Sequence, residues 1–419
     1  MPANTFTPFL VNSNFCHTQE DCATLPAFLN NISGNTGNSY IAYAIYKILF
    51  GRVVPLPEIK NLWTWDFANQ NELVEKINAE HSHVLFSLQD QIRLKLSYHI
   101  QPDWKRINQF LEKLKKPFVV FSLGANAFPG DEKDWYTHLQ PEFVRFLHIL
   151  AAHTTSLGVR GEETAAILRK LGILNVEAVG CPTYFEMGAN RPALVKKPLT
   201  PYDRALGANP WARVLQDEKD LIDFLYFSNE LSHAAHVTPA ELFQTTQGQC
   251  RCFAGIEAWK EFVSHYASSL FGRMHGGILA INSGVPSVIT NADLRAQEMC
   301  TLFGIPLRPG LQPNEHIWRQ IYEETDFSAL NQRYPALYTR FMNWLAQQGL
   351  GEEVRSHAHA WATQQPPFKE PVLQINPQVF LQVWDNLYYY NFYIPTRVLK
   401  RKLLEKKIFP LLRKLGLRK

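Results

Sequence analysis

The chain has 419 residues, of which 46% are hydrophobic and 19% are charged, and its formal net charge is +4. This length exceeds one ordinary core and predicts two domains of about 150 to 200 residues each. The apolar content excludes a largely disordered protein, and no run reaches the about 18 apolar residues of a membrane span. The first residues lack the basic start and apolar run of a signal peptide, so we expect a cytoplasmic protein.

Basic charge is concentrated at the C-terminal end. The last 23 residues hold ten Lys or Arg against one acid and so carry +9, which leaves −5 for residues 1–396. A nucleic-acid-binding protein more often spreads its basic side chains over a folded face, so we expect no nucleic acid as a partner. The cysteines form neither a CxxC pair nor a zinc-ligand series and predict reduced core residues: Cys16, Cys22, Cys181, Cys250, Cys252 and Cys300.

In chain order, the first half alternates short apolar runs with amphipathic stretches. A glycine-rich turn, GNTGN at 34–38, precedes a predicted helix at 39–51. Predicted strands follow at 83–88, 117–126, 156–160 and 176–180. Between the last two, GEETAAILRKLG has acids in its first turn, basic residues in its last turn and Gly172 as a stop, which predicts a helix.

The second half repeats this alternation after a segment rich in proline and glycine at 188–216, which predicts a linker. Strands are predicted at 222–228, 268–272 and 285–290, and helices at 238–247, 256–267, 276–284 and 293–304. Such an order is typical of a parallel sheet with crossover helices. We therefore predict an α/β protein with two Rossmann-like domains, 1–187 and 217–370, facing each other across a cleft, and a C-terminal tail at 371–419.

Cationic side chains stand where predicted strands end and helices begin. Arg160 ends one strand, Arg273 and His275 follow another, and Arg295 lies in the first turn of the helix after a third. Ligands of open α/β sheets bind beyond the carboxyl ends of the strands, where helix N-termini favour anions. A small, highly charged anion accounts for this pattern, and the glycines after His275 would let it approach the backbone.

Simpler interpretations exist for each of these residues. An arginine at a helix start can pair with a nearby carboxylate such as Glu162, Glu163 or Asp293. His275 alone can be a satisfied histidine at a strand end, although a pKa near 6.5 also suits a proton carrier. The GNTGN turn can be a plain turn with an N-cap, since it lacks the spacing of GxGxxG and the lysine of a P-loop.

Three blocks make the chain resemble the polysaccharide pyruvyl transferase family: GNTGN, SLGVRGEETAAILRKLGILNVEAVGCPTYF and FGRMHGGILAINSGVPSVITNADLRAQEMCTLFGIP. The resemblance runs from about 34 to about 306. It implies a fold like the GT-B glycosyltransferases, phosphoenolpyruvate as donor and a hexose of a bacterial surface or exported polysaccharide as acceptor. The family typically has an aspartate where this chain has Asn38.

The resemblance also implies site residues. The VRGE, RxHG and DxRxxE blocks of the family place its donor-site residues on Arg160, Arg273, His275 and Arg295, which we expect to be catalytic. We expect His275 to act as general acid or base and the arginines to stabilise the departing phosphate. We assign substrate binding to Asn35, Gly37, Asn38, Gly276, Gly277 and Glu298. The scheme needs no metal and no cofactor, since phosphoenolpyruvate is a substrate.

The tail from Tyr388 combines aromatic residues with a basic amphipathic stretch at 397–419. This pattern is typical of an anchor at an anionic membrane surface, so we expect peripheral attachment to the inner face of the cytoplasmic membrane, near a lipid-linked oligosaccharide acceptor. A terminal helix packed on the body is the alternative, and Pro410 would interrupt a continuous helix.

Two other functions stay open from the sequence. A GT-B glycosyltransferase that uses a nucleotide sugar would share the architecture, but it should place a carboxylate to hold the ribose, and no clear candidate follows the second-half strands. A non-catalytic glycan-binding protein would have no reason to retain Arg273 and His275.

Overall fold

The structure is a computed structural model of the whole chain. It describes residues 6–24, 27–28, 31–32, 35–56, 58–59, 62, 70–94, 102–127, 132–208, 222–224, 253–290, 293–309 and 318–372. The predicted helix at 238–247, the tail from 373 onward, Cys250 and Cys252 lie outside these ranges. Within them, no helix combines the length and the apolar character needed to cross a membrane.

The first unit, residues 6–187, is built on parallel strands. Four of them form a sheet in the order β2-β1-β3-β4, and β5 pairs with β6 beside it. The strands are β1 Pro8–Val11, β2 Glu58–Ile59, β3 His83–Ser87, β4 Phe118–Phe121, β5 Leu157–Val159 and β6 Val176–Ala178. The helices are η1 Glu20–Cys22, α2 Thr36–Phe50, α3 Gln70–Glu80, α4 Trp104–Leu111, η3 Trp135–His138, α5 Pro141–Ala152, α6 Glu162–Lys170 and α7 Pro182–Phe185.

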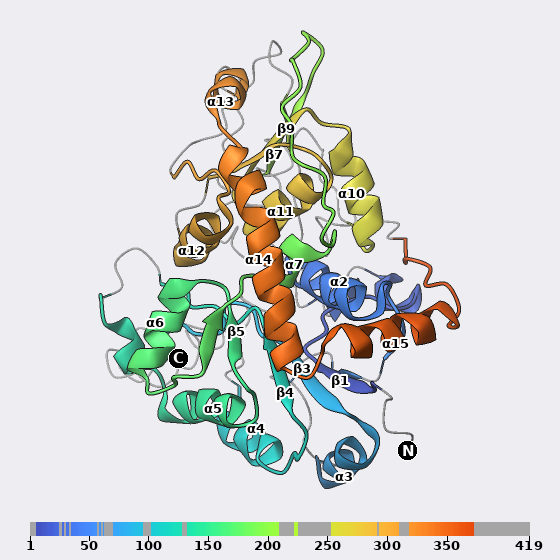
Figure 1. Ribbon diagram of the computed structural model, residues 1–419, viewed down its shortest axis with the longest axis vertical. Helices are drawn as coiled ribbons and strands as arrows, with labels where there is room; N and C mark the ends of the chain where they lie inside the picture. Colours follow the sequence, from blue (N-terminus) through green and yellow to red (C-terminus); the bar gives the residue numbers. More distant parts are fainter. Residues whose placement is uncertain are drawn as a thin grey trace, which may run out of the picture.

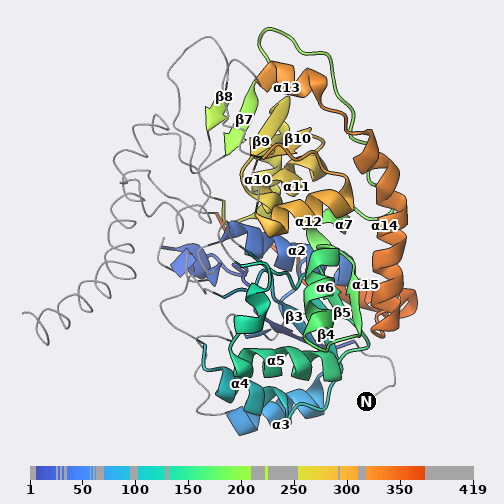
Figure 2. The same ribbon diagram turned by 90° about the vertical axis from the view of Figure 1, so that its left-hand side faces the viewer.

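The second unit, residues 205–324, has its own parallel sheet in the order β10-β9-β7-β8 (Figures 1 and 2). Its strands are β7 Ala205–Ala208, β8 Ile222–Phe224, β9 Ser268–Phe271 and β10 Ser287–Ile289. Its helices are α10 Ile256–Ser264, α11 Met274–Asn282, α12 Leu294–Phe303 and α13 Trp318–Glu324, followed by α14 Ser328–Gln347 and α15 Glu352–Thr363. The α/β class with two parallel-sheet units, predicted as GT-B-like, is confirmed.

Local signals set the helix bounds near the site. In α6, two acids occupy the first turn and two basic residues the last, and Gly172 follows with a φ of 83° that favours glycine. In α12, the Asp293 side chain accepts a hydrogen bond from the Ala296 N–H at 2.9 Å, and Gly304 ends the helix in the left-handed region. Both helices lie where the sequence predicts them.

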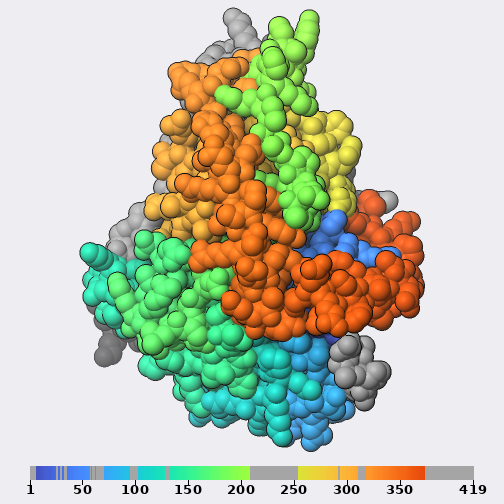
Figure 3. Space-filling view, in the orientation of Figure 1, coloured from blue at the N-terminus to red at the C-terminus, as the bar shows by residue number. Residues whose placement is uncertain are grey.

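Other parts of the fold differ from the sequence prediction. Strand β7 lies inside the predicted linker 188–216, where it pairs with both β8 and β9. Helices α14 and α15 belong to the predicted second domain, but α14 runs along both units and α15 packs against α2 of the first unit (Figures 1 and 3). The indole of Trp344 on α14 packs edge-on against Phe121 of the first sheet, with ring centroids 5.5 Å apart. The domain boundaries themselves stay a prediction.

The two units share a continuous apolar core around α2, α7 and α11. A buried polar network crosses this junction, because the Asn282 amide donates to the Tyr40 hydroxyl at 2.8 Å, and Tyr40 donates to Glu186 at 3.2 Å. Lys260 of α10 completes the network with an ion pair to Glu186 at 2.9 Å. These contacts join α2 and α7 of the first unit to α10 and α11 of the second.

Candidate active site

Arg160 lies at the end of β5 with only 2% of its surface exposed. Its Nε donates to the Ser122 hydroxyl at 3.0 Å, whereas its buried Nη2 has no hydrogen-bond partner. Gly124 makes room for the side chain, since a Cβ there would lie 2.7 Å from Arg160 Cδ. A buried guanidinium with an unsatisfied donor is ready to bind an anionic oxygen.

Arg295 connects the two units by ion pairs. It donates to Asp293 in its own helix turn, as the simpler interpretation of the sequence expected, and to Asp90 of the first unit at 3.0 Å. Burial by itself would raise the pKa of the Asp90 carboxyl. The guanidinium groups of Arg295, Arg93 and Arg160 outweigh burial and hold that pKa far below its usual range, so Asp90 is a fixed negative charge.

His275 lies in the first turn of α11, two residues after the N-cap residue Arg273. Burial, reinforced by the nearby guanidinium groups of Arg160 and Arg295, holds the pKa of the imidazole well below its ordinary value. The ring is therefore neutral at pH 7 in the free protein. The start of α2 lies against it, because a Cβ on Gly37 would stand 2.9 Å from His275 Nδ1.

A chain of hydrogen bonds connects Arg160 with His275. Arg160 donates to Ser122, the Ser122 hydroxyl donates to the Cys181 sulfur at 3.2 Å, and that sulfur lies 3.6 Å from His275 Nε2. The Thr183 hydroxyl also donates to the sulfur, at 3.2 Å. Cys181 is fully buried, so it is a core residue as predicted, but it also contacts the expected proton carrier.

Sequence reasoning missed Asp90, Ser122 and Cys181. Asp90 and Cys181 follow predicted strands of the first unit, whereas Ser122 follows β4 but lies inside the longer predicted strand at 117–126. None of the three is cationic, so the pattern of cationic side chains that indicates the anion site does not include them.

The predicted substrate-binding residues fall into two groups. Asn35 caps α2 by accepting from the Gly37 N–H at 2.9 Å, and Asn38 is buried one residue further along the same helix start. The GNTGN block is thus an N-cap turn, as the simpler interpretation expected, and it also contacts His275. Its first glycine lies outside the described residues.

The other group serves packing. A Cβ on Gly276 would stand 2.5 Å from the Phe271 ring, and one on Gly277 would stand 2.3 Å from Ile289. These glycines let α11 lie close to its own sheet, and their role in admitting a ligand to the backbone stays a prediction.

Glu298 joins the two units. Its carboxylate accepts from the Thr164 N–H at 3.1 Å and from the Thr164 hydroxyl at 2.9 Å, so a side chain of α12 caps helix α6. Burial raises the pKa of the Glu298 carboxyl to about 7, although these hydrogen bonds act against it. Both oxygens are engaged by protein groups, which makes Glu298 a structural cap in this structure and leaves its predicted role in substrate binding without support.

The charges at the junction do not cancel. Excluding Glu298, the net charge of the interacting groups is about +2. The four guanidinium groups belong to Arg93, Arg160, Arg273 and Arg295, and the two carboxylates belong to Asp90 and Asp293. The site is therefore suited to a small ligand with several negative charges.

The family profile described as polysaccharide pyruvyl transferase matches residues 35–293, more than half of the chain. The chain belongs to the polysaccharide pyruvyl transferase family. The matched range contains Arg160, Arg273 and His275 and ends just before Arg295. Family membership supports a transferase that moves pyruvyl groups to polysaccharide. A comparison with curated protein sequences found no match.

Solved structures that resemble the chain include two UDP-N-acetylglucosamine 2-epimerases. The enzyme from Rickettsia bellii is 12% identical with a TM-score of 0.41, over 93% of this chain and 100% of its own. A second epimerase is 11% identical with a TM-score of 0.44, over 87% and 99%. The Anabaena protein HepE, in complex with UDP and glucose, is 8% identical with a TM-score of 0.38, over 91% and 99%. Similarity at this level says nothing about the substrate of this chain.

Proposed function

We propose that this protein transfers the pyruvyl group of phosphoenolpyruvate to two neighbouring hydroxyls of a sugar, forming a ketal and releasing phosphate. The observation that carries the proposal is the neutral His275 ring surrounded by guanidinium groups with a surplus positive charge. Phosphoenolpyruvate brings a carboxylate and a phosphate, and arginine can hold either one through two parallel hydrogen bonds. Arg160 has a buried donor available for one of them.

The protonation state of His275 sets the order of events. In the free protein the guanidinium groups help to keep the ring neutral, so it has no proton to give. A bound donor anion would offset their charge and raise the pKa of the imidazole, so the ring would take up a proton as phosphoenolpyruvate binds. His275 is then the general acid that protonates C3 of the enolpyruvyl group.

The remaining steps balance. After C3 gains a proton, C2 is electrophilic, and the first sugar hydroxyl forms a C–O bond to it and loses its proton. The C2–O bond to phosphate then breaks with its electron pair moving to the phosphate oxygen, which the arginines stabilise. The second hydroxyl adds to C2 and loses its proton. One proton ends on C3 and one on phosphate, and neutral His275 can receive the proton of an attacking hydroxyl.

The acceptor and the location are part of the same proposal. We propose a hexose of a surface or exported polysaccharide, or of its lipid-linked precursor, as the acceptor. The basic amphipathic segment 397–419 would hold the enzyme at the inner face of the cytoplasmic membrane. A chain truncated after Thr396 should lose binding to vesicles that contain anionic lipid. If it binds as fully as the whole protein, the anchor is refuted.

Activity is tested by supplying phosphoenolpyruvate with candidate glycans and following phosphate release together with product mass. The expected product is heavier than the acceptor by one pyruvate less one water, with one phosphate released per ketal. Replacing His275 with Ala and Arg273 with Lys should each lower the rate at least tenfold. Phosphate release without a heavier glycan, or turnover only with nucleotide sugars, would refute the assignment.

A further inference from the structure

Two loops of the first unit run side by side next to the anion site. Residues 88–94 follow β3 and residues 122–127 follow β4, and a bridge between Ile92 and Ala125 joins them. The Asn126 N–H donates to the Ile92 carbonyl at 2.9 Å. Each loop begins with a non-glycine residue at positive φ, 50° at Gln89 and 60° at Ser122. Such backbone is uncommon and tends to occur at ligand sites.

These loops carry two buried amides whose carbonyl oxygens have no hydrogen-bond partner. Gln91 is 3% exposed and Asn126 is 1% exposed, and the unpaired atoms are Gln91 Oε1 and Asn126 Oδ1. The Asn126 amide cannot simply be turned over, because its Nδ2 donates to the Asp90 carboxylate at 3.3 Å. A buried carbonyl without a donor costs about 1 to 3 kcal/mol, so a bound O–H or N–H is expected opposite it.

Both amides lie beside the predicted donor residues. Asp90 precedes Gln91 in the loop, accepts from Asn126 and pairs with Arg295 of the second unit. Arg93 of the same loop pairs with Asp90 at 3.5 Å. The side chain of Asp90 thus lies between the arginines of the anion site and the buried, neutral amides of the paired loops.

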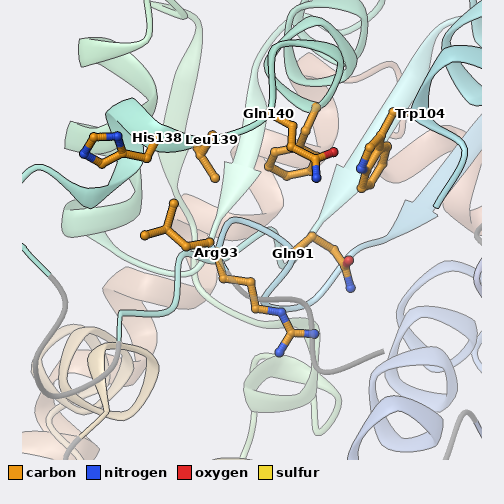
Figure 4. Close-up of a pocket in the computed structure, with 8 residues that line it drawn as sticks. Gln91, Arg93, Trp104, His138, Leu139 and Gln140 are labelled. Carbon is orange, nitrogen blue, oxygen red and sulfur yellow. The ribbon is translucent and has the colours of Figure 1, made fainter. Parts of the chain in front are cut away.

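A pocket lies against the side of this loop that faces α4 and the segment before α5. It is lined by Gln91, Arg93 and Leu94 of the loop, by Trp104 of α4, and by the segment from His138 to Phe143 that leads into α5. In Figure 4, the polar ends of Gln91 and Arg93 extend to the same side of the loop, away from His138 and Leu139. The loop therefore lies between the pocket wall, formed by α4 and the segment before α5, and the buried amide of Gln91.

We infer that the paired loops form the acceptor site, where Gln91 Oε1 and Asn126 Oδ1 accept hydrogen bonds from hydroxyls of a hexose unit. The inference rests on the proposed function, because it assigns the anionic donor and the neutral acceptor of that reaction to separate sites. Guanidinium groups of the second unit and Arg160 hold the anionic donor, whereas neutral carbonyls on the first unit hold the neutral, hydroxyl-rich acceptor. Asp90 connects the two sites, because its carboxylate accepts from Asn126 of one loop and pairs with Arg295 of the second unit.

The experiment separates sugar binding from catalysis. Binding of lactose, a soluble probe with two hexose units, is measured by saturation-transfer NMR without phosphoenolpyruvate. The variants Gln91→Met and Asn126→Val should each weaken lactose binding roughly tenfold, the effect of one lost hydrogen bond of about 1.4 kcal/mol. Binding of phosphoenolpyruvate by calorimetry should be unchanged in Gln91→Met, which leaves the hydrogen bond from Asn126 to Asp90 in place. Gln140→Met is the matched control, because Gln140 is an exposed amide of the same pocket and should have little effect.

A measurement on the unaltered protein covers the case in which a variant does not fold. Saturating lactose should shift the side-chain amide NMR signals of Asn126 and Gln91. Absence of any such shift, or lactose binding by both folded variants at the level of the unaltered protein, would overturn the acceptor site. Failure of the proposed function would look different: lactose would bind and respond to the variants, but no ketal would form with phosphoenolpyruvate.

Discussion

Replacing Glu298 with Gln tests how the two units are held together. The Glu298 carboxylate caps α6 through Thr164, and burial raises its pKa from 4.5 to about 7. Because the folded-state pKa lies above the unfolded-state value, the folded protein binds more protons between pH 4.5 and about 7. Stability contributed by this group is therefore fully present below pH 4.5 and is lost as the pH rises to about 7.

The magnitude follows from the size of the pKa shift. A change of about 2.5 units corresponds to about 3 kcal/mol, of which about 2 to 3 kcal/mol falls between pH 5 and pH 8. Gln keeps the shape of the side chain and can donate and accept toward Thr164, but it does not titrate. The Glu298→Gln variant should therefore gain about 2 to 3 kcal/mol relative to the unaltered protein as the pH rises from 5 to 8.

Urea unfolding at several pH values measures this difference. Groups that titrate elsewhere in the chain cancel between the two proteins, so the difference reports on Glu298 alone. Replacing Thr164 with Val removes the hydroxyl that contacts the carboxylate and serves as a second variant in a double-mutant cycle. A free-energy difference that stays constant from pH 5 to pH 8 would refute the assigned pKa and its cause.

Three further predictions concern the junction and the site. Gly37→Ala should lower the turnover rate at least tenfold, because the new Cβ would displace the His275 ring. Gly351→Ala is the control and should leave the rate unchanged, because the nearest atom to its new Cβ is 4.0 Å away. Equal turnover rates in the two variants would contradict the contact between Gly37 and His275. Lys260→Met should lower the free energy of unfolding in urea by about 3 to 5 kcal/mol, since it leaves the buried Glu186 carboxylate without its ion-pair partner. A decrease below about 1 kcal/mol would show that the ion pair is solvated. Calorimetry of phosphoenolpyruvate binding at pH 7 in two buffers of different ionisation enthalpy should report proton uptake that His275→Gln abolishes; identical heats in both buffers would exclude a neutral His275 that charges on binding.

Much of the fold follows from local sequence signals. The strands at 83–88 and 117–126 and the helices at 161–172 and 293–304 were predicted because caps, charge placement and apolar runs of the right length coincide. The rule that ligands bind beyond the carboxyl ends of parallel strands then predicted the site from strand positions alone. The structure brings Arg160, His275 and Arg295 to one junction, as that rule requires.

The sequence by itself determined which cationic residues meet, whereas only the tertiary structure decided what each one contacts. The sequence of strand β7, ALGA, has no strong strand signal, and pairing with β9 across some 60 residues stabilises the strand. The hydrogen bonds of Glu298 to Thr164 form only because α12 lies against α6. The contact of Cys181 with His275 likewise joins residues 94 apart in the chain. Long-range contacts of this kind leave no periodicity or spacing in the sequence, because they depend on how separately predictable elements pack.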